Sequence, residues 1–333
     1  MQRESTGGMP RWAVRPVRGT GVGGAIATVR ATGAHVRASA PLVLLRDSTR
    51  NRRVGILLVV GATLCFSVLD ASAKWLVQSL PVLQVVWLRF VIHVLLMALI
   101  LAPRHGRALV RMKSPRLQAL RGAMLASMTA LNFVALQYLQ LAETAAIQFS
   151  VPILIALLSA WWLHERLDAR RWFAIVCGFI GVLLVIRPGS QAFHPAILLC
   201  VAQAVLYAVF NMLTRRMAAT ETPESMQLLS AAMAALLLAP VALAHWQMPA
   251  TSTQWLLLVL CGLMGGVGHL FVAMAHRGAS AAVLGPFLYQ QILYMTLLGW
   301  LVFGQVPDAF VVAGALVVVL SGLYLLWMEM RRG

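Results

Sequence analysis

Residues 54–77 read VGILLVVGATLCFSVLDASAKWLV, and residues 83–102 read LQVVWLRFVIHVLLMALILA. Each run has about 20 mostly apolar residues, the length that crosses about 30 Å of hydrocarbon as an α-helix. Only the short segment QSLPV separates the two runs, so two helices joined by it must be antiparallel neighbours. This stretch therefore predicts an α-helical membrane protein.

The same criterion, applied along all 333 residues, predicts eight more spanning helices. They cover about 118–138, 143–163, 171–187, 195–214, 225–244, 254–275, 280–303 and 309–328. The composition agrees, because 60% of the residues are hydrophobic, 11% are charged and the mean hydropathy is +0.82. A soluble domain does not carry such a composition. We predict an all-α membrane protein with ten transmembrane helices.

The formal net charge of +17 would favour a nucleic-acid partner in a soluble protein, but here it follows the topology. Basic residues fill every even break between the runs, whereas the odd breaks lack them apart from Arg187. Loops on the cytoplasmic side carry such an excess of Arg and Lys. We therefore predict an inner-membrane protein with both termini in the cytoplasm and no nucleic-acid partner. The basic residues are Arg104, Arg107, Arg111, Lys113, Arg116, Arg121, Arg166, Arg170, Arg171, Arg215, Arg216 and Arg277.

The first 53 residues differ from the rest of the chain. They hold ten Arg against Glu4 and Asp47, contain Gly-rich stretches and show no sustained periodicity. We interpret residues 1–53 as a disordered basic cytoplasmic tail. A transit peptide, a lipid-surface anchor and an extension from an upstream start are open alternatives.

The two halves of the predicted bundle resemble each other. Residues 162–169 can be aligned with residues 300–309, which matches Glu165 with Gln305 and Asp168 with Asp308. Upstream, residues 144–147 align with 280–283. Five helices repeated once must invert, because five is odd. We predict two inverted five-helix repeats, residues 54–188 and 195–328, an arrangement typical of secondary transporters.

These segments resemble the EamA-type branch of the drug/metabolite transporter superfamily, whose members have ten helices in two five-helix repeats. The resemblance runs from about residue 54 to 328. The resemblance rests on SVLDASAK at 67–74, WLRF at 87–90, the stretch from Pro152 to HERL at 164–167, and residues 285–304. Gln305 stands where the family commonly has Glu. The resemblance implies a carrier of small metabolites, either an exporter or an importer of a vitamin or an adenosyl metabolite.

Three ionisable residues lie at membrane depth, namely Asp70, Lys74 and Arg89. A charge at the bilayer centre costs about 2.5–3.5 kcal/mol on insertion scales and usually finds a partner. Asp70 and Arg89 are each about 10 Å deep at roughly 1.5 Å per residue, so an ion pair between them is feasible. Lys74 is an alternative partner, or its long stem extends toward the surface. This cluster either binds substrate or a proton, or permanently locks the first two helices.

Polar and aromatic residues on the inner helices are candidates for a substrate pocket, with interhelical hydrogen bonding as the alternative. They are Asn132, Gln148, Tyr207, Asn211, Tyr289, Gln290 and Tyr294. Pro152 and Pro286 each fall in the fourth helix of a half, where proline frees a carbonyl group and kinks the helix. Interrupted helices at corresponding positions indicate a binding site, although a fixed packing kink is the alternative.

Other classes of function receive no support from the motifs. The four cysteines lie in apolar runs without CxxC or Cys/His ligand spacing, so we expect no disulfide, metal or cofactor. The sequence contains neither HExxH nor GxxxxGK[ST], and we expect no enzyme activity. We predict a secondary transporter of small metabolites that exports amino-acid-like or related solutes by alternating access, with proton coupling as an option. A channel or passive membrane subunit is the alternative class; the expected partners are a small-molecule substrate and the lipid bilayer, and a homodimer stays open.

Overall fold

The computed structural model describes residues 49–163, 168–191, 193–218, 220–279 and 281–331. The regular elements of this part of the chain are all helices, and it contains no strand. Its helices supply ten spans long and apolar enough to cross a membrane, so the predicted all-α membrane fold is confirmed. Most of the predicted N-terminal tail, residues 1–48, lies outside the described residues.

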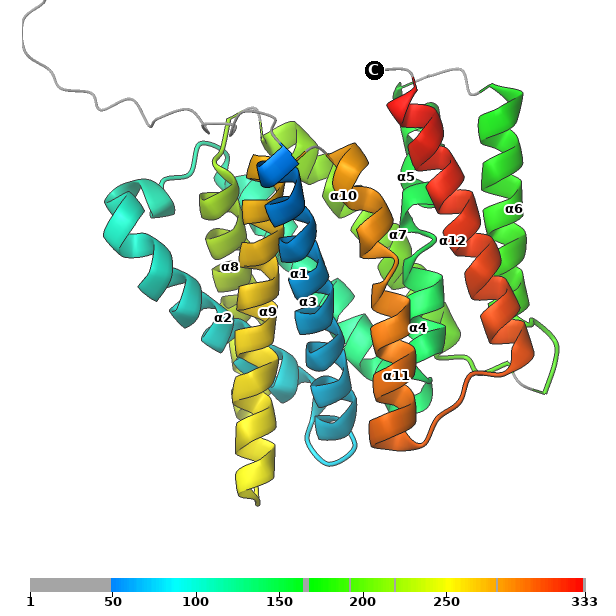
Figure 1. Cartoon of the computed structure of the whole chain (residues 1–333). Coiled ribbons are helices and arrows are strands. Elements are labelled where there is room, and N and C mark those ends of the chain that lie inside the picture. Colours follow the sequence, from blue (N-terminus) through cyan, green and yellow to red (C-terminus); the bar gives the residue numbers. More distant parts are fainter. Residues whose placement is uncertain (1–48, 164–167, 192, 219, 280, 332–333) are drawn as a thin grey trace, which may run out of the picture. The chain divides into compact units, whose positions relative to one another are not determined.

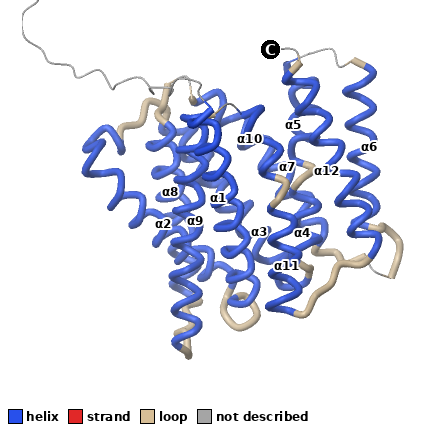
Figure 2. The backbone as a smooth tube through the Cα atoms, viewed as in Figure 1, coloured by secondary structure: helices blue, strands red, loops and turns tan. Residues whose placement is uncertain are grey.

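The helices follow one another with short connections (Figures 1 and 2). The first half contains α1 (Thr49–Leu76), α2 (Val82–His105), α3 (Pro115–Tyr138), α4 (Leu141–Gln148), α5 (Val151–Leu163) and α6 (Ala169–Ile186), with a 3-10 turn at Gly106–Val110. The second half contains α7 (Ile197–Met217), α8 (Pro223–Ala244), α9 (Ser252–Gly278), α10 (Ala281–Leu288), α11 (Gln291–Phe303) and α12 (Ala309–Met330).

The fourth span of each half is interrupted. α4 gives way to α5 at Phe149 and Ser150, and α10 gives way to α11 at Tyr289 and Gln290. The two interruptions lie at corresponding positions of the two halves. The prolines predicted to cause them lie on different sides of the breaks. Pro152 follows the first break, as the second residue of α5, whereas Pro286 precedes the second break inside α10. Proline is tolerated in the first turn of a helix, where its missing N–H is not needed. Pro152 therefore begins a helix rather than kinking one.

The two halves share one plan. The helices α4, α5 and α6 begin at residues 141, 151 and 169, and α10, α11 and α12 begin at 281, 291 and 309, so each pair differs by the same 140 residues. Packing obeys the same exchange of halves: α1 packs on α9 as α7 packs on α3, while α2 pairs with α8 and α6 with α12. The predicted inverted repeat is thus realised as a pseudo-symmetric bundle, and Figure 1 shows α6 beside α12 and α1 beside α9.

The contact between α6 and α12 depends on two glycines. A Cβ atom added to Gly314 would lie 2.6 Å from the carbonyl oxygen of Gly181, and one added to Gly181 would lie 2.9 Å from that of Gly314. Small residues let helix backbones approach closely in a membrane, where packing replaces the hydrophobic effect as the driving force. The last helices of the two repeats are therefore held backbone to backbone.

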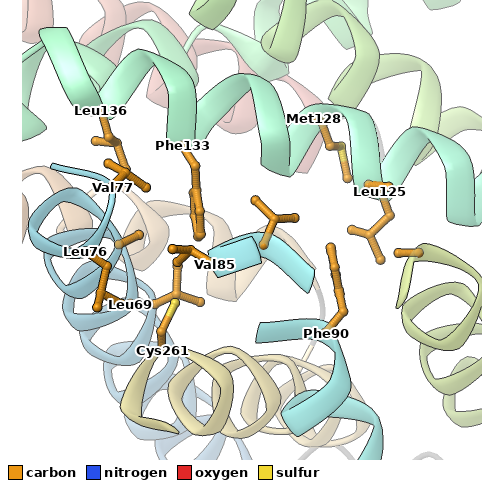
Figure 3. Packing of buried hydrophobic residues seen from close by; sticks show 14 of the residues in the cluster. Leu69, Leu76, Val77, Val85, Phe90, Leu125, Met128, Phe133, Leu136 and Cys261 are labelled. Carbon is orange, nitrogen blue, oxygen red and sulfur yellow. The ribbon is translucent and has the colours of Figure 1, made fainter. Parts of the chain in front are cut away.

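The largest core cluster lies among α1, α2, α3 and α9 (Figure 3). Phe90 and Phe133 are almost completely buried there, together with Leu69, Leu76 and Cys261. The cluster extends to buried residues of α4, α7, α8 and α11, so this core joins helices of both halves. The polar residues described below lie on these same helices, so their side chains are positioned by a well-packed scaffold.

Candidate functional site

Asp70 is bound by a neutral partner. Its Oδ1 accepts a hydrogen bond of 3.0 Å from Nδ2 of Asn132, and both side chains are half-buried. Asp70 lies six residues before the end of α1 at Leu76, and Asn132 lies six residues before the end of α3 at Tyr138. At about 1.5 Å per residue, both are some 9 Å from those helix ends. The structure thus brings together two of the predicted site residues at matching depth.

Arg89 lies near this pair without binding the carboxylate. Its Nη1 donates 3.1 Å to Oγ1 of Thr129, and its guanidinium carbon is 4.7 Å from the ring centre of Phe90. In the part of the chain that the structure describes, no ion pair within 4.0 Å joins Asp70 to Arg89. Thr129 and Asn132 are three residues apart on α3 and so share a face. The feasible Asp70–Arg89 pair is replaced by two separate contacts with α3.

Lys74 has a different role from either predicted one. It is buried, and its Nζ donates 2.8 Å to the carbonyl oxygen of Leu136 and 2.6 Å to that of Leu139. The last carbonyls of a helix have no partner within the helix and favour a nearby cation. Lys74 therefore caps the end of α3, so it is neither paired with Asp70 nor extended to the surface.

The two interrupted helices meet. The rings of Phe149 and Tyr289, one in each break, have centroids 5.0 Å apart. Next to them, Gln290 donates from Nε2 to Oγ1 of Thr63 on α1 at 3.1 Å. The hydroxyl of Tyr289 and Oε1 of Gln148 are enclosed and have no hydrogen-bond partner among the described residues. The breaks therefore bring polar groups with unused bonding capacity into the interior.

On α7, Tyr207 and Asn211 share a face one turn apart. Nδ2 of Asn211 donates 2.7 Å to the backbone oxygen of Tyr207, and the Tyr207 ring lies 6.3 Å from that of Phe210. Asn211 stands six residues before the end of α7 at Met217, just as Asp70 stands six before the end of α1. Tyr294, the last predicted site residue, is half-buried on α11. At the position equivalent to Asp70, the second half thus has an amide instead of a carboxylate.

The sequence prediction for Arg121 is wrong. We placed it in the second basic loop, but it is the seventh residue of α3 and is buried, 4% exposed. Its Nε donates 2.9 Å to Oγ1 of Thr214, and its Nη1 donates 2.7 Å to the backbone oxygen of Met226 and 2.5 Å to Oγ of Ser230. A signal in the sequence was Gln118, a second polar residue three positions earlier on the same helical face. Its Nε2 also donates to the Met226 backbone oxygen and to Oγ of Ser230.

A second cluster also needed the tertiary structure. His93 on α2 and His269 on α9 stack with ring centroids 5.4 Å apart. His93 is fully buried, and neither of its ring nitrogens has a hydrogen-bond partner in the described ranges. Among the described residues, no group of three His, Cys, Asp or Glu could hold a metal ion. The two histidines lie on different helices, so spacing along the chain could not reveal their contact.

Ion pairs occur at the ends of the bundle. Arg187, after α6, donates from Nη2 to Oδ2 of Asp308 at 2.6 Å, just before α12 begins. Arg277 near the end of α9 pairs with Glu224 in the first turn of α8. The pKa of the Asp308 carboxyl is lowered, first by the backbone N–H of Val311 and then by Arg187. These contacts fasten helix ends.

Ten spans in two inverted repeats, with corresponding interrupted helices and polar groups at membrane depth, define the class of inverted-repeat membrane transporters. The chain matches the EamA-like transporter family twice, over residues 53–187 and 194–328. It belongs to that family. It is therefore a multi-pass membrane protein and a transporter of the drug/metabolite transporter type.

The relatives carry different solutes. The chain is 31% identical to a riboflavin transporter of Vibrio cholerae over 191 residues, which cover 56% of this chain and 63% of that one. It is 25% identical to an S-adenosylmethionine uptake transporter of Rickettsia felis, with 86% and 97% covered. It is 28% identical to the pseudopaline exporter CntI of Pseudomonas aeruginosa, with 80% and 94% covered. One solved crystal structure shares the fold at a TM-score of 0.59 and 21% identity, covering 83% and 98%.

Proposed function

We propose that this protein moves a small metabolite by alternating access, with Asp70 at the site that binds the solute or a coupling proton. The observation that carries the proposal is the half-buried Asp70 carboxylate, whose hydrogen-bond donor is the neutral amide of Asn132. A carboxylate within a membrane usually has a charged partner or a functional role. Asp70 retains the capacity to accept a proton or a cationic group of a solute.

The pocket in this proposal includes the predicted residues of both halves. Asn132 and Arg89 would contribute from the first half, Tyr207 and Asn211 from α7, and the two breaks would contribute Gln148, Tyr289, Gln290 and Tyr294. Interrupted helices at the repeat interface supply free backbone groups in many secondary transporters. Rocking of one repeat against the other would then expose this region to each side of the membrane in turn.

For the solute and direction, we propose export of an amino-acid-like compound. The pseudopaline exporter, of which the match covers 94%, supports this direction. Uptake of a vitamin or an adenosyl metabolite is the second candidate, because relatives are named as riboflavin and S-adenosylmethionine transporters. The two candidates differ in the direction of net transport across the membrane.

We further propose an inner-membrane location with both termini in the cytoplasm. Ten spans place the two ends on the same side, and Figure 1 shows the start of α1 and the end of α12 at the same end of the described bundle. We assign this end of the bundle to the cytoplasmic side, because basic residues lie between α2 and α3 and near the ends of α7 and α9. Reporter fusions at the C-terminus should be active as a cytoplasmic fluorescent protein and inactive as a periplasmic phosphatase.

Counterflow in proteoliposomes tests transport directly. Vesicles loaded with one unlabelled solute and diluted into its labelled form should accumulate label transiently and saturably, whereas a channel would only equilibrate. Riboflavin, S-adenosylmethionine and a mixture of amino acids are the solutes to screen, with and without a pH gradient. Wild-type protein that is folded but exchanges no solute of any class would contradict the proposal.

Asp70→Asn separates binding from packing. It keeps the shape of the side chain and removes the negative charge, so we expect exchange to fall at least about tenfold with normal expression and melting temperature. Poor folding of Asp70→Asn would instead favour a structural role for the residue. Asp70→Glu, which retains the charge, serves as the control and should recover part of the exchange.

A further inference from the structure

Arg121, on α3 of the first half, is a buried cation held by neutral groups of the second half. Its hydrogen-bond partners are the hydroxyl of Thr214 on α7 and, on α8, the hydroxyl of Ser230 and the backbone oxygen of Met226. We call these residues, with Gln118, the Arg121 cluster. In the described ranges, no carboxylate lies within 4.0 Å of its guanidinium. The positive charge of Arg121 therefore has no local counter-charge.

The charge inventory of the spans leaves this cation unbalanced. Arg89 and Arg121 lie more than one turn inside their helices. Among the residues that the structure describes, Asp70 is the one carboxylate at a comparable distance from its helix end, because Glu143 and Glu224 occupy first turns. Asp70 can offset one guanidinium at most. A buried charge is costly unless it is paired or hydrogen-bonded, and a second ionic partner would reduce that cost.

The guanidinium also has an unused donor. Nε and Nη1 of Arg121 make the three bonds described above, whereas Nη2 makes none within the described chain. Nη2 is not fully enclosed, so part of its surface is accessible. The centre of the Phe210 ring lies 4.4 Å from the guanidinium carbon, so this ring packs against the guanidinium. One nitrogen of a rigidly held fork is therefore presented for an additional acceptor.

The cluster adjoins the candidate pocket on α7. Tyr207, Asn211 and Thr214 follow at spacings of four and three residues, so they share one helical face with the contact to Arg121. Along α3, Arg121 and Asn132 are eleven residues apart, about 16 Å at 1.5 Å per residue. A solute of amino-acid size cannot touch both at once, so Arg121 marks a site separate from Asp70.

We propose that Arg121 binds an anionic group, a carboxylate or a phosphate, of the transported solute. Arginine suits this task because it stays charged and its fork matches carboxylate and phosphate oxygens. Thr214, Ser230 and the Met226 carbonyl orient the fork, and Nη2 meets the anion. This inference rests on the proposed transport function and narrows its substrates to compounds with at least one negative group.

The test compares solutes that differ in one charge. Glutamate with glutamine tests a carboxylate, and riboflavin 5′-phosphate with riboflavin tests a phosphate. The full chain is reconstituted as wild type, Arg121→Gln, Arg121→Lys and Arg277→Gln, and counterflow of each solute is measured. Arg277→Gln is the matched control, since it removes an arginine that already pairs with Glu224 outside the cluster. Ligand-induced shifts in melting temperature in detergent are measured for the same proteins and solutes.

We expect wild type to exchange the acid of at least one pair about tenfold better than its neutral counterpart, a preference within the range of one charged hydrogen bond. Arg121→Gln should abolish that preference, Arg121→Lys should keep part of it, and Arg277→Gln should leave it unchanged. The pair that responds identifies carboxylate or phosphate. A wild type without preference, or an Arg121→Gln variant that loses both members of the pair equally, overturns the proposal.

The melting shifts keep the two proposals separable. If no solute exchanges but an acid stabilises the wild type and not Arg121→Gln, the anion site stands and the transport proposal fails. If solutes exchange without an acid preference and no acid stabilises the wild type, transport stands and the anion site fails. If Arg121→Gln and Arg121→Lys both lower the melting temperature and no acid shifts any protein, Arg121 is a structural link among α3, α7 and α8.

Discussion

Phe149 and Tyr289 are the first residues after α4 and α10, and their rings lie 5.0 Å apart. They occupy equivalent positions of the two repeats, so the local two-fold relationship of the bundle passes close to their contact. Because this contact joins the two repeats, rocking of one repeat against the other must change it. A link between the two breaks would therefore restrain the motion of one repeat against the other.

Linking the two breaks should therefore stop transport. In a chain without its four native cysteines, Phe149→Cys and Tyr289→Cys joined by a short, reducible bifunctional thiol reagent should exchange solute at least about tenfold more slowly. Reduction of the link should restore exchange, because the repeats regain their relative motion. Each single-cysteine variant with the same reagent is the control. Unchanged exchange in the linked protein would show that the breaks do not move apart.

The Gly181–Gly314 contact should tolerate no side chain. Gly314→Ala places a Cβ atom 2.6 Å from the Gly181 carbonyl oxygen, and backbone cannot move aside as a side chain can. We expect a loss of about 1–3 kcal/mol in unfolding free energy, measured by denaturant titration in detergent. Gly299→Ala is the matched control, because its nearest new contact is 3.8 Å away and Ala favours a helix. Equal stability of both variants would argue against a close α6–α12 crossing.

Lys74→Met should destabilise the protein without changing which solutes it carries. The substitution keeps the length of the apolar stem but removes the ammonium group bound to the Leu136 and Leu139 carbonyls. Hydrogen bonds to a charged group contribute about 1.5–3 kcal/mol, so the melting temperature should fall clearly. Gln78→Met, one turn further along at an exposed site, should change little. An altered solute preference in Lys74→Met would place Lys74 in the pocket instead.

The Asp308 contacts predict a dependence on acid pH. The Val311 N–H and then Arg187 lower the pKa of this carboxyl in the folded state relative to the unfolded chain. A lowered folded pKa means that the stabilisation is complete above the unfolded pKa, near 4, and is lost as the pH falls through the folded value. The side chain is 48% exposed, so solvent weakens the effect.

Melting curves between pH 2.5 and 7 check this prediction for wild type and Asp308→Asn, where the pH range follows from the usual Asp pKa of about 4. At neutral pH the wild type should have a higher melting temperature than Asp308→Asn. This difference between the two proteins should vanish at the acid end of the range. Arg187→Gln should reproduce only part of the loss, since the hydrogen bond from Val311 remains. A difference that is independent of pH would contradict the assignment to the carboxylate.

Hydropathy and length were sufficient to predict the ten spans, while the resemblance between the two halves predicted the inverted repeat. Both properties are local to each segment, and lipid enforces them strictly, since every backbone polar group must be bonded within the helix. The same patterns placed Asp70 and Arg89 at similar depth correctly. They could not choose Asn132 as the partner of Asp70, because partner choice depends on how each helix is rotated about its axis.

For the helix breaks and the buried Arg121, too, the sequence predicted one part and the tertiary structure decided the other. Pro152 and Pro286 indicated which helices are interrupted, but the positions of the breaks follow from packing of the two repeats and not from proline alone. Arg121 looked like the end of a basic loop, because a lone charge near the start of an apolar run has no local sign of burial. Its partners come from α7 and α8, more than 90 residues along the chain.

The sequence by itself thus determined the membrane-spanning class, the number of spans and their repeat, since these depend on segment length and composition. Only the tertiary structure decided which polar groups meet: Asp70 with Asn132, Lys74 with the end of α3, and Arg121 with Thr214 and Ser230. The physical reason is that hydrophobic burial in lipid acts on each helix separately, whereas hydrogen bonds depend on the register and rotation of helices against one another.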